Sequence, residues 1–320
     1  YGLKCIVGGK YVVDGNIEWL KRKLPYVDLF IEGAGERKIL HALSNIESNG
    51  LEYFGYYNRL DYSLLSDYKL YNPSIELARG CGRGCAYCAD GNKKKSSVKD
   101  ANSVIDELHF VEQTYDYEDF NIYFQMATFQ VEDRWIELYR RRMCEFDKIF
   151  YWRCTSRIDA LDLKSIPKLG QIGMRVLDLG LESASHRQLK LMKKTTNPKD
   201  YLQKAEEILH VAYESGIWVK LNVLLTAGET YETLTETMQW LDKNRKYIKG
   251  ISANCETIYG PYNHLLESLK PFGATYVCNS DLEEKGYSYI NLSDEINYDL
   301  AKTLAKDISR TIMTADDYYD

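Results

Sequence analysis

Residues 74–100, SIELARGCGRGCAYCADGNKKKSSVKD, form the stretch around which the rest of the chain is organised. The stretch begins with an apolar, strand-like run at 75–78 and then breaks into a glycine-punctuated loop. That loop carries Cys81, Cys85 and Cys88 in a C-x3-C-x2-C spacing. The sulfurs can turn toward one centre because the glycines between them tolerate left-handed backbone conformations. Since thiolates are soft ligands, the spacing predicts an iron–sulfur cluster or a zinc site.

The number of thiols separates these two possibilities. A structural zinc site needs four ligands, and this loop supplies three. A 4Fe–4S cluster held by three thiolates keeps one iron without a protein ligand, and that iron is open to a substrate. A zinc ion with a fourth ligand from elsewhere, a plain electron-transfer cluster and disulfide bonds are the alternatives. The remaining cysteines stand singly, without a second paired motif: Cys5, Cys144, Cys154, Cys255 and Cys278.

The loop, with Tyr87 just before its third cysteine, resembles the cluster loop of the radical S-adenosylmethionine (SAM) superfamily. The resemblance implies that Cys81, Cys85 and Cys88 hold a 4Fe–4S cluster whose open iron chelates the amino and carboxylate groups of SAM. It also implies that an electron from the cluster cleaves SAM to methionine and a 5′-deoxyadenosyl radical, which takes a hydrogen atom from the substrate. The resemblance covers most of residues 1–260 and is strongest between 74 and 230.

Composition and charge narrow the class of protein. The 320 residues suffice for one large α/β domain with a small appendage. The net charge of −6 argues against a general nucleic-acid binder, and no apolar run reaches the length of a membrane span. The eight cysteines do not suggest a disulfide framework, and a cluster loop suits a reducing compartment, so we predict a cytoplasmic location. Because the chain begins with Tyr1 rather than Met, we expect residues upstream of it.

From residue 74 onward the pattern alternates strands with helices. Six strand-plus-helix units predict parallel strands with right-handed crossovers. Six units do not close an eight-stranded barrel, so the expected fold is α/β, a partial (β/α)6 TIM-like barrel over 74–260. Functional groups are expected at the carboxyl ends of its strands. A C-terminal extension over 261–320 includes an amphipathic packing helix at 293–312. The six predicted strands span residues 75–78, 121–124, 149–154, 175–180, 218–225 and 251–258.

Residues 1–50 predict a fragment of a Rossmann-like α/β unit, with strands at 4–7 and 27–31 and helices at 16–23 and 37–49. In the second helix Ile39, Leu40 and Leu43 are expected to face inward. The unit resembles the end of the cobalamin-binding domain that precedes many radical SAM barrels, with GAGE at 33–36 in place of a GEGE-like turn. The Asp-x-His-x-x-Gly signature of cobalt ligation is absent from this sequence, so a packing subdomain without cofactor is the alternative. The polar, tyrosine-rich residues 51–73 are predicted to be a linker.

Polar residues at the ends of the second and third predicted strands are candidates for binding SAM. The resemblance places Gln125 near the SAM ammonium group, where related proteins often have an acidic residue. Ser156 and Arg157 follow the third strand, and an arginine can grip a carboxylate through two hydrogen bonds.

The fourth and fifth predicted strands supply further candidates. Glu182 and Ser183 stand in a run that resembles the GxES segment of cobalamin-type radical SAM enzymes, which implies that Glu182 accepts hydrogen bonds from the SAM ribose or ammonium group. Asn222 lies inside the fifth strand; a satisfied core amide is its alternative role, and a mutual ion pair is the alternative for Arg157 and Glu182. Residues 226–230 resemble a GxPGET turn without its proline, and Thr230 is predicted to cap the next helix.

The function predicted from these features is that of a radical SAM enzyme acting on a small-molecule or peptide substrate. With cobalamin bound, the enzyme would methylate carbon or rearrange its substrate. Without cobalamin, epimerisation, dehydrogenation or cyclisation would follow, and the favoured setting is natural-product or peptide tailoring. The lysine run at 93–95 suits a solvated surface or an acidic electron donor such as flavodoxin, with ferredoxin as the other donor considered. The rival hypothesis is a non-catalytic iron–sulfur electron carrier or binding protein.

Overall fold

The computed structural model describes residues 4–9, 11–12, 14–44, 59–88, 91, 93–115, 119–260, 264–278 and 280–312. The chain divides into two compact units. The smaller combines Tyr1–Asn58, Ile258–His264 and Cys278–Ser288, and the larger combines Arg59–Thr257, Leu265–Val277 and Tyr289–Asp320. The domain boundaries given above remain predictions.

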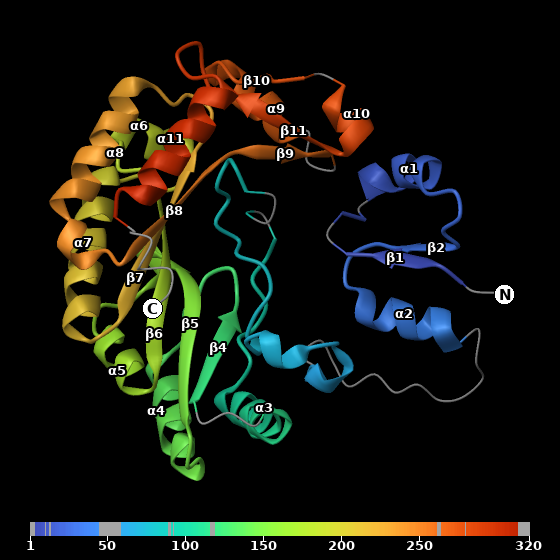
Figure 1. Ribbon diagram of the computed structural model, residues 1–320, viewed down its shortest axis with the longest axis vertical. Helices are drawn as coiled ribbons and strands as arrows, with labels where there is room; N and C mark the ends of the chain where they lie inside the picture. The colour runs from blue at the N-terminus through green and yellow to red at the C-terminus, as the bar shows by residue number, and fades with distance from the viewer. Residues whose placement is uncertain are drawn as a thin grey trace. The chain divides into compact units, whose positions relative to one another are not determined.

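The larger unit is built on a six-stranded parallel sheet in which each strand pairs with the next along the chain (Figure 1). This order confirms the predicted partial TIM-like barrel, and the described strands do not close into a ring. The strand at 218–225 has the predicted bounds, and the others differ from prediction by one to three residues at an end. The strands are β3 (Ser74–Glu76), β4 (Asp119–Gln125), β5 (Ile149–Arg157), β6 (Met174–Glu182), β7 (Trp218–Leu225) and β8 (Gly250–Cys255).

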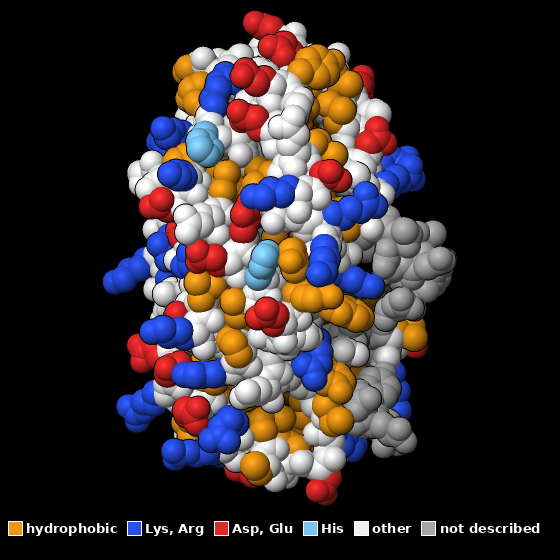
Figure 2. All heavy atoms as spheres, turned by 90° about the vertical axis from the view of Figure 1, so that its left-hand side faces the viewer, with side chains coloured by type: hydrophobic (Ala, Val, Ile, Leu, Met, Phe, Trp, Pro, Cys, Tyr) orange, Lys and Arg blue, Asp and Glu red, His pale blue; other side chains and the backbone are white. Residues whose placement is uncertain are grey.

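Helices connect consecutive strands, and α5 to α8 lie along one side of the sheet (Figure 1). The Asp100 side chain caps the helix that begins at Ala101, where it accepts a hydrogen bond from the Ser103 amide. Thr230 forms a capping box with Thr233, as predicted for Thr230. Lys, Arg, Asp and Glu are interspersed on the outer side of this layer (Figure 2). The helices are α3 (Ala101–Thr114), α4 (Asp133–Arg142), α5 (Ile166–Gln171), α6 (His186–Leu191), α7 (Pro198–Glu214) and α8 (Tyr231–Lys243), with 3-10 turns η3 (Met143–Glu145), η4 (Ile158–Ala160) and η5 (Arg245–Tyr247).

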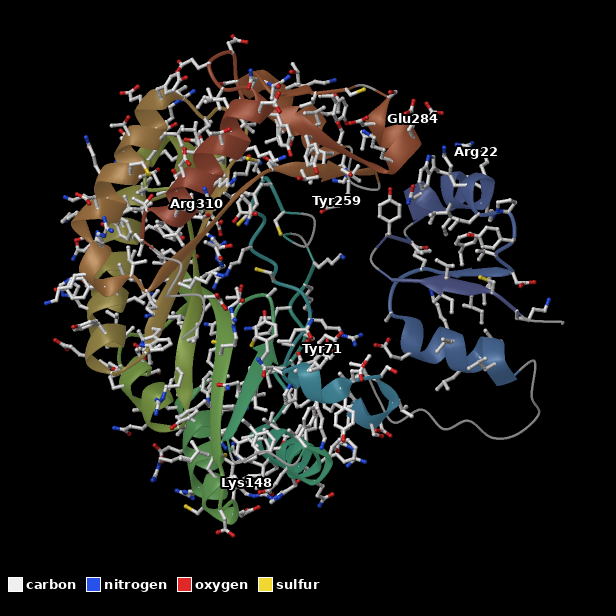
Figure 3. All side chains as sticks on the ribbon, in the orientation of Figure 1. Arg22, Tyr71, Lys148, Tyr259, Glu284 and Arg310 are labelled. Carbon is white, nitrogen blue, oxygen red and sulfur yellow. The ribbon has the colours of Figure 1, made fainter. Side chains whose placement is uncertain are left out.

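The two faces of the sheet differ in character because side chains alternate along each strand. On β5, Phe150, Trp152 and Cys154 are buried, and the Phe124 and Trp152 rings pack 4.8 Å apart. The intervening β5 residues belong to the opposite face, which we call the inner face, and are more open. Lys148, which immediately precedes β5, marks the amino end of the sheet (Figure 3).

Part of the tyrosine-rich stretch packs on the larger unit. Residues 59–73 contain the 3-10 turns η1 (Tyr62–Leu64) and η2 (Tyr68–Leu70). The Tyr62 and Tyr68 rings stand edge-on to Tyr115, with centroids 5.6 and 5.1 Å away, and the Tyr62 hydroxyl donates to the Ser74 carbonyl. These contacts lie directly before β3, so the chain enters the sheet from an anchored segment.

Two predicted elements near the C-terminus differ from the structure in ways that have a visible cause. The sixth strand, predicted as continuous over 251–258, breaks at the buried Glu256 into β8 and β9 (Thr257–Tyr259). The C-terminal helix α11 (Tyr298–Arg310) begins five residues later than predicted, because a turn formed by the Leu292 and Ser293 amides on the Ile296 carbonyl precedes it. Asn297 then caps α11, which packs against β8. The remaining elements of the extension are α9 (His264–Leu269), η7 (Lys270–Phe272), β10 (Thr275–Tyr276) and β11 (Tyr287–Asn291), with β10 antiparallel to β11.

The smaller unit contains the predicted strand–helix–strand–helix order. Its strands β1 (Ile6–Gly8) and β2 (Leu29–Ile31) pair in parallel, and its helices are α1 (Asp14–Lys23), α2 (Gly35–Ser44) and α10 (Asp281–Lys285). The predicted helix at 37–49 therefore begins two residues earlier, and positions 45–49 lie outside the described residues. The expectation that Ile39 and Leu43 face inward is wrong, because their side chains are 41% and 39% exposed.

Candidate functional site

The cysteine loop joins β3 to α3 and folds back on itself through backbone hydrogen bonds. The Cys81 amide donates to the Lys93 carbonyl at 3.0 Å, and the Gly84 amide donates to the Gly91 carbonyl at 2.8 Å. Gly80 has φ +75°, and a Cβ atom there would overlap the Lys94 carbonyl oxygen. Only glycine fits at this position, which explains the close wrapping expected from the sequence.

All eight cysteines are free thiols, so the disulfide alternative is wrong. Cys85 is buried, whereas Cys81 and Cys88 are partly exposed. The Cys81 sulfur lies 3.3 Å from the Thr128 hydroxyl, which follows β4. Within the ranges that the structure describes, no three His, Cys, Asp or Glu side chains are arranged to hold one metal ion.

Arg157 connects the cysteine loop to the carboxyl end of β5. Its Nη1 donates to the Cys85 sulfur at 2.9 Å, and its Nε and Nη2 donate to the Asp159 carboxylate at 2.8 and 3.1 Å. Nη2 also donates to the Lys194 carbonyl at 2.9 Å. Burial opposes the charged form of Arg157, but the Asp159 hydrogen bonds and the nearby Cys85 outweigh it, so its pKa is raised. Burial likewise opposes an ionised Asp159, yet Arg157 lowers the pKa of this carboxyl.

Glu182 and Lys194 form a second charged pair at the end of β6. Their Oε1 and Nζ atoms are 2.9 Å apart, and only 2% of the Lys194 side chain is exposed. Lys194 Nζ also lies 3.4 Å from the Tyr87 hydroxyl, which brings this pair beside the cysteine loop. The pKa of Tyr87 is raised by burial first, and by the Glu182 and Cys85 charges second. Arg157 and Glu182 thus have separate partners, and the alternative that they pair with each other is wrong.

The backbone at Glu182, whose carboxylate pairs with Lys194, is strained. Glu182 has φ +67°, a left-handed conformation that is uncommon for residues other than glycine. The pairing of β6 with β7 shifts register at this point, between Gly180 and Glu182. A Cβ atom on Gly180 would stand 2.7 Å from Glu182 Oε1, so the small residue makes room for the carboxylate. Such strain clusters at functional sites.

The other predicted site residues lie apart from this cluster or have protein partners. Gln125 is exposed, and its side-chain oxygen accepts from Ser74 at 3.3 Å. The buried Ser156 hydroxyl donates to the Phe129 carbonyl at 2.7 Å, and the Ser183 and Thr237 hydroxyls are 3.1 Å apart. Asn222 is half-buried and lines a cavity, so it is not a core amide.

Sequence reasoning missed Lys194, Asp159 and Thr128. Asp159 follows Arg157 by two residues, and this Arg-x-Asp spacing was a usable signal. Lys194 sits beside Lys193 in a run that looks solvated, but Lys193 is exposed and Lys194 is buried. That difference arises from the packing of the turn after α6, which no local pattern reveals.

The donor set fits a 4Fe–4S cluster. It consists of three thiols within eight residues; Arg157 donates to the Cys85 sulfur, and the Thr128 hydroxyl lies within hydrogen-bond distance of the Cys81 sulfur. Hydrogen bonds to cluster sulfurs are one means by which proteins set cluster potentials. The buried Glu182–Lys194 pair adds one acceptor and one donor beside the loop, as a zwitterionic ligand requires.

A family model described as the radical SAM superfamily matches residues 75–241, about half of the chain. The chain therefore belongs to the radical SAM superfamily, whose members use a 4Fe–4S cluster and SAM. No curated protein matches the sequence.

Two solved structures with a similar fold are radical SAM proteins described with cobalamin. The enzyme OxsB with aqua-cobalamin bound aligns with a TM-score of 0.68 at 13% identity, over 94% of this chain and 53% of that one. The methyltransferase TsrM from Kitasatospora setae, with tryptophan substrate and a SAM analogue bound, aligns with a TM-score of 0.66 at 16% identity, over 90% of this chain and 68% of that one. The chain thus spans about half the length of OxsB. These likenesses confirm the expected fold and its resemblance to the cobalamin-type branch.

Among the described helices, none combines the length and the apolar character needed to cross a membrane.

Proposed function

We propose that Cys81, Cys85 and Cys88 hold a 4Fe–4S cluster with which this protein cleaves SAM reductively and abstracts hydrogen from an unactivated carbon of a small-molecule or peptide substrate. When bound, the cluster supplies the electron that breaks the carbon–sulfur bond of SAM. The observation that carries the proposal is the meeting of three free thiols, the Arg157–Asp159 pair and the Glu182–Lys194 pair at one end of the sheet.

Within this proposal the charged residues have distinct roles. Arg157 holds the Cys85 sulfur through Nη1 while Asp159 and the Lys194 carbonyl fix its guanidinium group. Glu182 accepts hydrogen bonds from the ammonium or ribose of SAM, and Lys194 donates to the SAM carboxylate. Tyr87 borders the site on the side of the cysteine loop. Gln125 and Asn222 remain candidates for further contacts. Ser156 and Ser183 have an indirect role, because their hydroxyl hydrogen bonds hold the carboxyl end of β5 and the residues after β6 in place.

The outcome of the radical reaction depends on cobalamin, and we propose cobalamin-dependent methylation or rearrangement as the first candidate. The support is the fold shared with OxsB and TsrM, together with the parallel β1–β2 pair of the smaller unit. Epimerisation, dehydrogenation or cyclisation without cobalamin is the second candidate. The visible spectrum of protein purified from cells grown with the vitamin distinguishes them, because a bound corrinoid absorbs after the cluster has been removed.

The decisive experiment measures SAM cleavage. The protein is reconstituted anaerobically with iron and sulfide, reduced with dithionite and incubated with SAM, and 5′-deoxyadenosine is quantified. Formation of 5′-deoxyadenosine supports the proposal. A fully reconstituted sample that forms none favours the rival function, a non-catalytic iron–sulfur electron carrier.

The physiological electron donor and compartment follow from the same proposal. A flavodoxin or ferredoxin, meeting the lysine run at 93–95, would deliver the electron, and a reducing cytoplasm would preserve the thiols. Replacing dithionite with a reduced flavodoxin in the cleavage assay tests the donor directly.

A further inference from the structure

The inner face of the sheet holds a cavity of about 740 Å³ within the larger unit. Most of its lining comes from β4, β5, β6 and β7. On β7 the lining residues are Trp218, Lys220 and Asn222, which alternate along the strand. On β6 and β7 the lining residues fall among the first five of each strand, and on β4 and β5 they lie near the middle. No described residue of the cysteine loop lines the cavity, which is therefore separate from the loop at the carboxyl ends.

The charges in the cavity do not balance. Arg153, Arg175 and Lys220 line it, against the single carboxylate of Asp178, which is an excess of two positive charges. Asp178 accepts from Nε of Arg153 at 3.1 Å and also from its Nη2. The Asp178 side chain is 8% exposed while that of Arg153 is 47% exposed, so the guanidinium group keeps an accessible side.

Of the three cations in the lining, Lys220 has no partner among the described residues. It is half-buried, and no hydrogen bond or ion pair joins its ammonium group to any described residue. It stands opposite Asp178 in the β6–β7 pairing, next to the Arg153–Asp178 pair. Asn222, one inner-face position further, has no hydrogen-bond partner among the described side chains either, and it stands opposite Gly180. Arg153 already engages the Asp178 carboxylate, so a bound anion would give Lys220 a counter-charge of its own.

The cavity lies within one small molecule's length of the proposed cofactor end. Asp178 precedes Glu182 by four residues on β6, a rise of about 13 Å along a strand. Asn222 lies between these levels because it pairs with Gly180. A ligand held by Lys220 at one end therefore reaches the Glu182 level at its other end.

We propose that this cavity binds a small-molecule substrate through an oxyanion group, a carboxylate or a phosphate, which Lys220 and Arg153 contact while Asn222 donates to it. The inference rests on the proposed function, because it gives the substrate class for the same reaction. The Tyr123 and Trp218 side chains line the cavity with aromatic surface for the body of the molecule. The excess positive charge disfavours substrates whose buried end is cationic.

Binding of matched probes to the cluster-reconstituted protein tests this class without any turnover. The probes are 3-phenylpropionate, its neutral amide 3-phenylpropionamide, and 2-phenylethyl phosphate, and dissociation constants are measured anaerobically by ligand-observed NMR. We expect at least one anion to bind about tenfold more tightly than the amide, a preference that weakens at high salt. The tighter anion then identifies carboxylate or phosphate as the recognised group. Equal binding of all three probes would overturn the inference.

Variants locate the binding in this cavity. Lys220→Met removes the unpartnered charge and should abolish the preference for the anion, whereas Lys190→Met, which removes an exposed lysine of α6, should retain it. If Lys220→Met does not fold, Asn222→Asp places a negative charge at the same site with almost no change in shape, and it should also abolish the preference. An anion preference that survives in a folded cavity variant would overturn the inference. Failure of the wild-type protein to form 5′-deoxyadenosine would instead overturn the proposed function and leave the binding result standing.

Discussion

The carboxyl end of the sheet and its inner face differ in how their charged side chains are paired. At the carboxyl end, Arg157 is paired with Asp159 and Glu182 with Lys194, and of these four side chains only that of Asp159 is substantially exposed. Further down the inner face, Lys220 stands opposite Asp178 and has no partner within the described part of the chain. The first arrangement is preorganised for a ligand of fixed shape, such as a resident cofactor. The second is incomplete until an anion arrives, as a site for an exchanging substrate would be.

The largest expected effect tests the preorganised end at its metal ligands. Cys85→Ala should remove the brown cluster absorbance and lower 5′-deoxyadenosine formation by at least about a hundredfold, because an absent ligand is not replaced by a neighbour. Anaerobic absorption spectra and iron analysis of the reconstituted protein measure the first effect. Cys144→Ala, which changes an exposed thiol outside the loop, is the matched control and should keep both properties. A stable, SAM-cleaving cluster in Cys85→Ala would show that the ligand assignment is wrong.

The next effect tests whether the Glu182–Lys194 pair is a true buried ion pair. Lys194→Met leaves the Glu182 carboxylate without its partner, and we expect the free energy of unfolding to fall by about 3 kcal/mol. Urea denaturation of the apo-protein measures it. The control Lys193→Met changes the exposed neighbouring lysine and should stay within about 0.5 kcal/mol of the wild type.

A double variant separates charge from packing in the same pair. Adding Glu182→Gln to Lys194→Met removes the stranded charge and should recover part of the lost stability. No recovery would mean that the lysine contributes through packing of its aliphatic stem rather than through its charge.

Local features of this sheet could be predicted from the sequence, and features that depend on distant contacts could not. The cysteine spacing and the flanking glycines are local features, so the loop and its three thiols followed from the pattern. The alternation in 218–225 likewise predicted β7 with its correct bounds. Lys194 could not be found in this way, because its burial depends on a turn packing against Tyr87 and Glu182 from distant parts of the chain. The end of the sixth strand was missed for a similar reason, since the burial of Glu256 at the break and its hydrogen bond with Thr226 join residues 30 positions apart in the chain.

Glu256 gives a smaller effect, on the dependence of stability on pH. Burial raises the pKa of Glu256 to about 8, against a hydrogen bond from Ala227 that lowers it. The folded protein therefore keeps this proton between its ordinary pKa of 4.5 and about pH 8, where the unfolded chain has released it. Because the folded state binds more protons in this window, the free energy of unfolding should fall as pH rises through it.

Glu256→Gln tests this dependence by keeping the shape of the side chain without its titration. The variant should lose part of the decline between pH 5 and pH 8 and be more stable than the wild type at pH 8, by on the order of 2 kcal/mol. Urea denaturation across this range measures it, with Glu214→Gln at the end of α7 as the control that keeps the wild-type slope. Parallel profiles for wild type and Glu256→Gln would show that Glu256 is already ionised in the folded protein.

The smallest expected effect is on the reduction potential of the cluster bound by the cysteine loop. The Thr128 hydroxyl lies 3.3 Å from the Cys81 sulfur, and Thr128→Val removes it while keeping the branched shape. A donor to a cluster sulfur stabilises the reduced, more negative form, so its loss should lower the reduction potential slightly and leave iron content unchanged. A redox titration followed by electron paramagnetic resonance measures the shift, with Thr235→Val on the exposed side of α8 as the control. An unchanged potential in Thr128→Val would mean that the hydroxyl accepts or faces away once the cluster is bound, which would leave Arg157 as the donor that sets the charge on the loop.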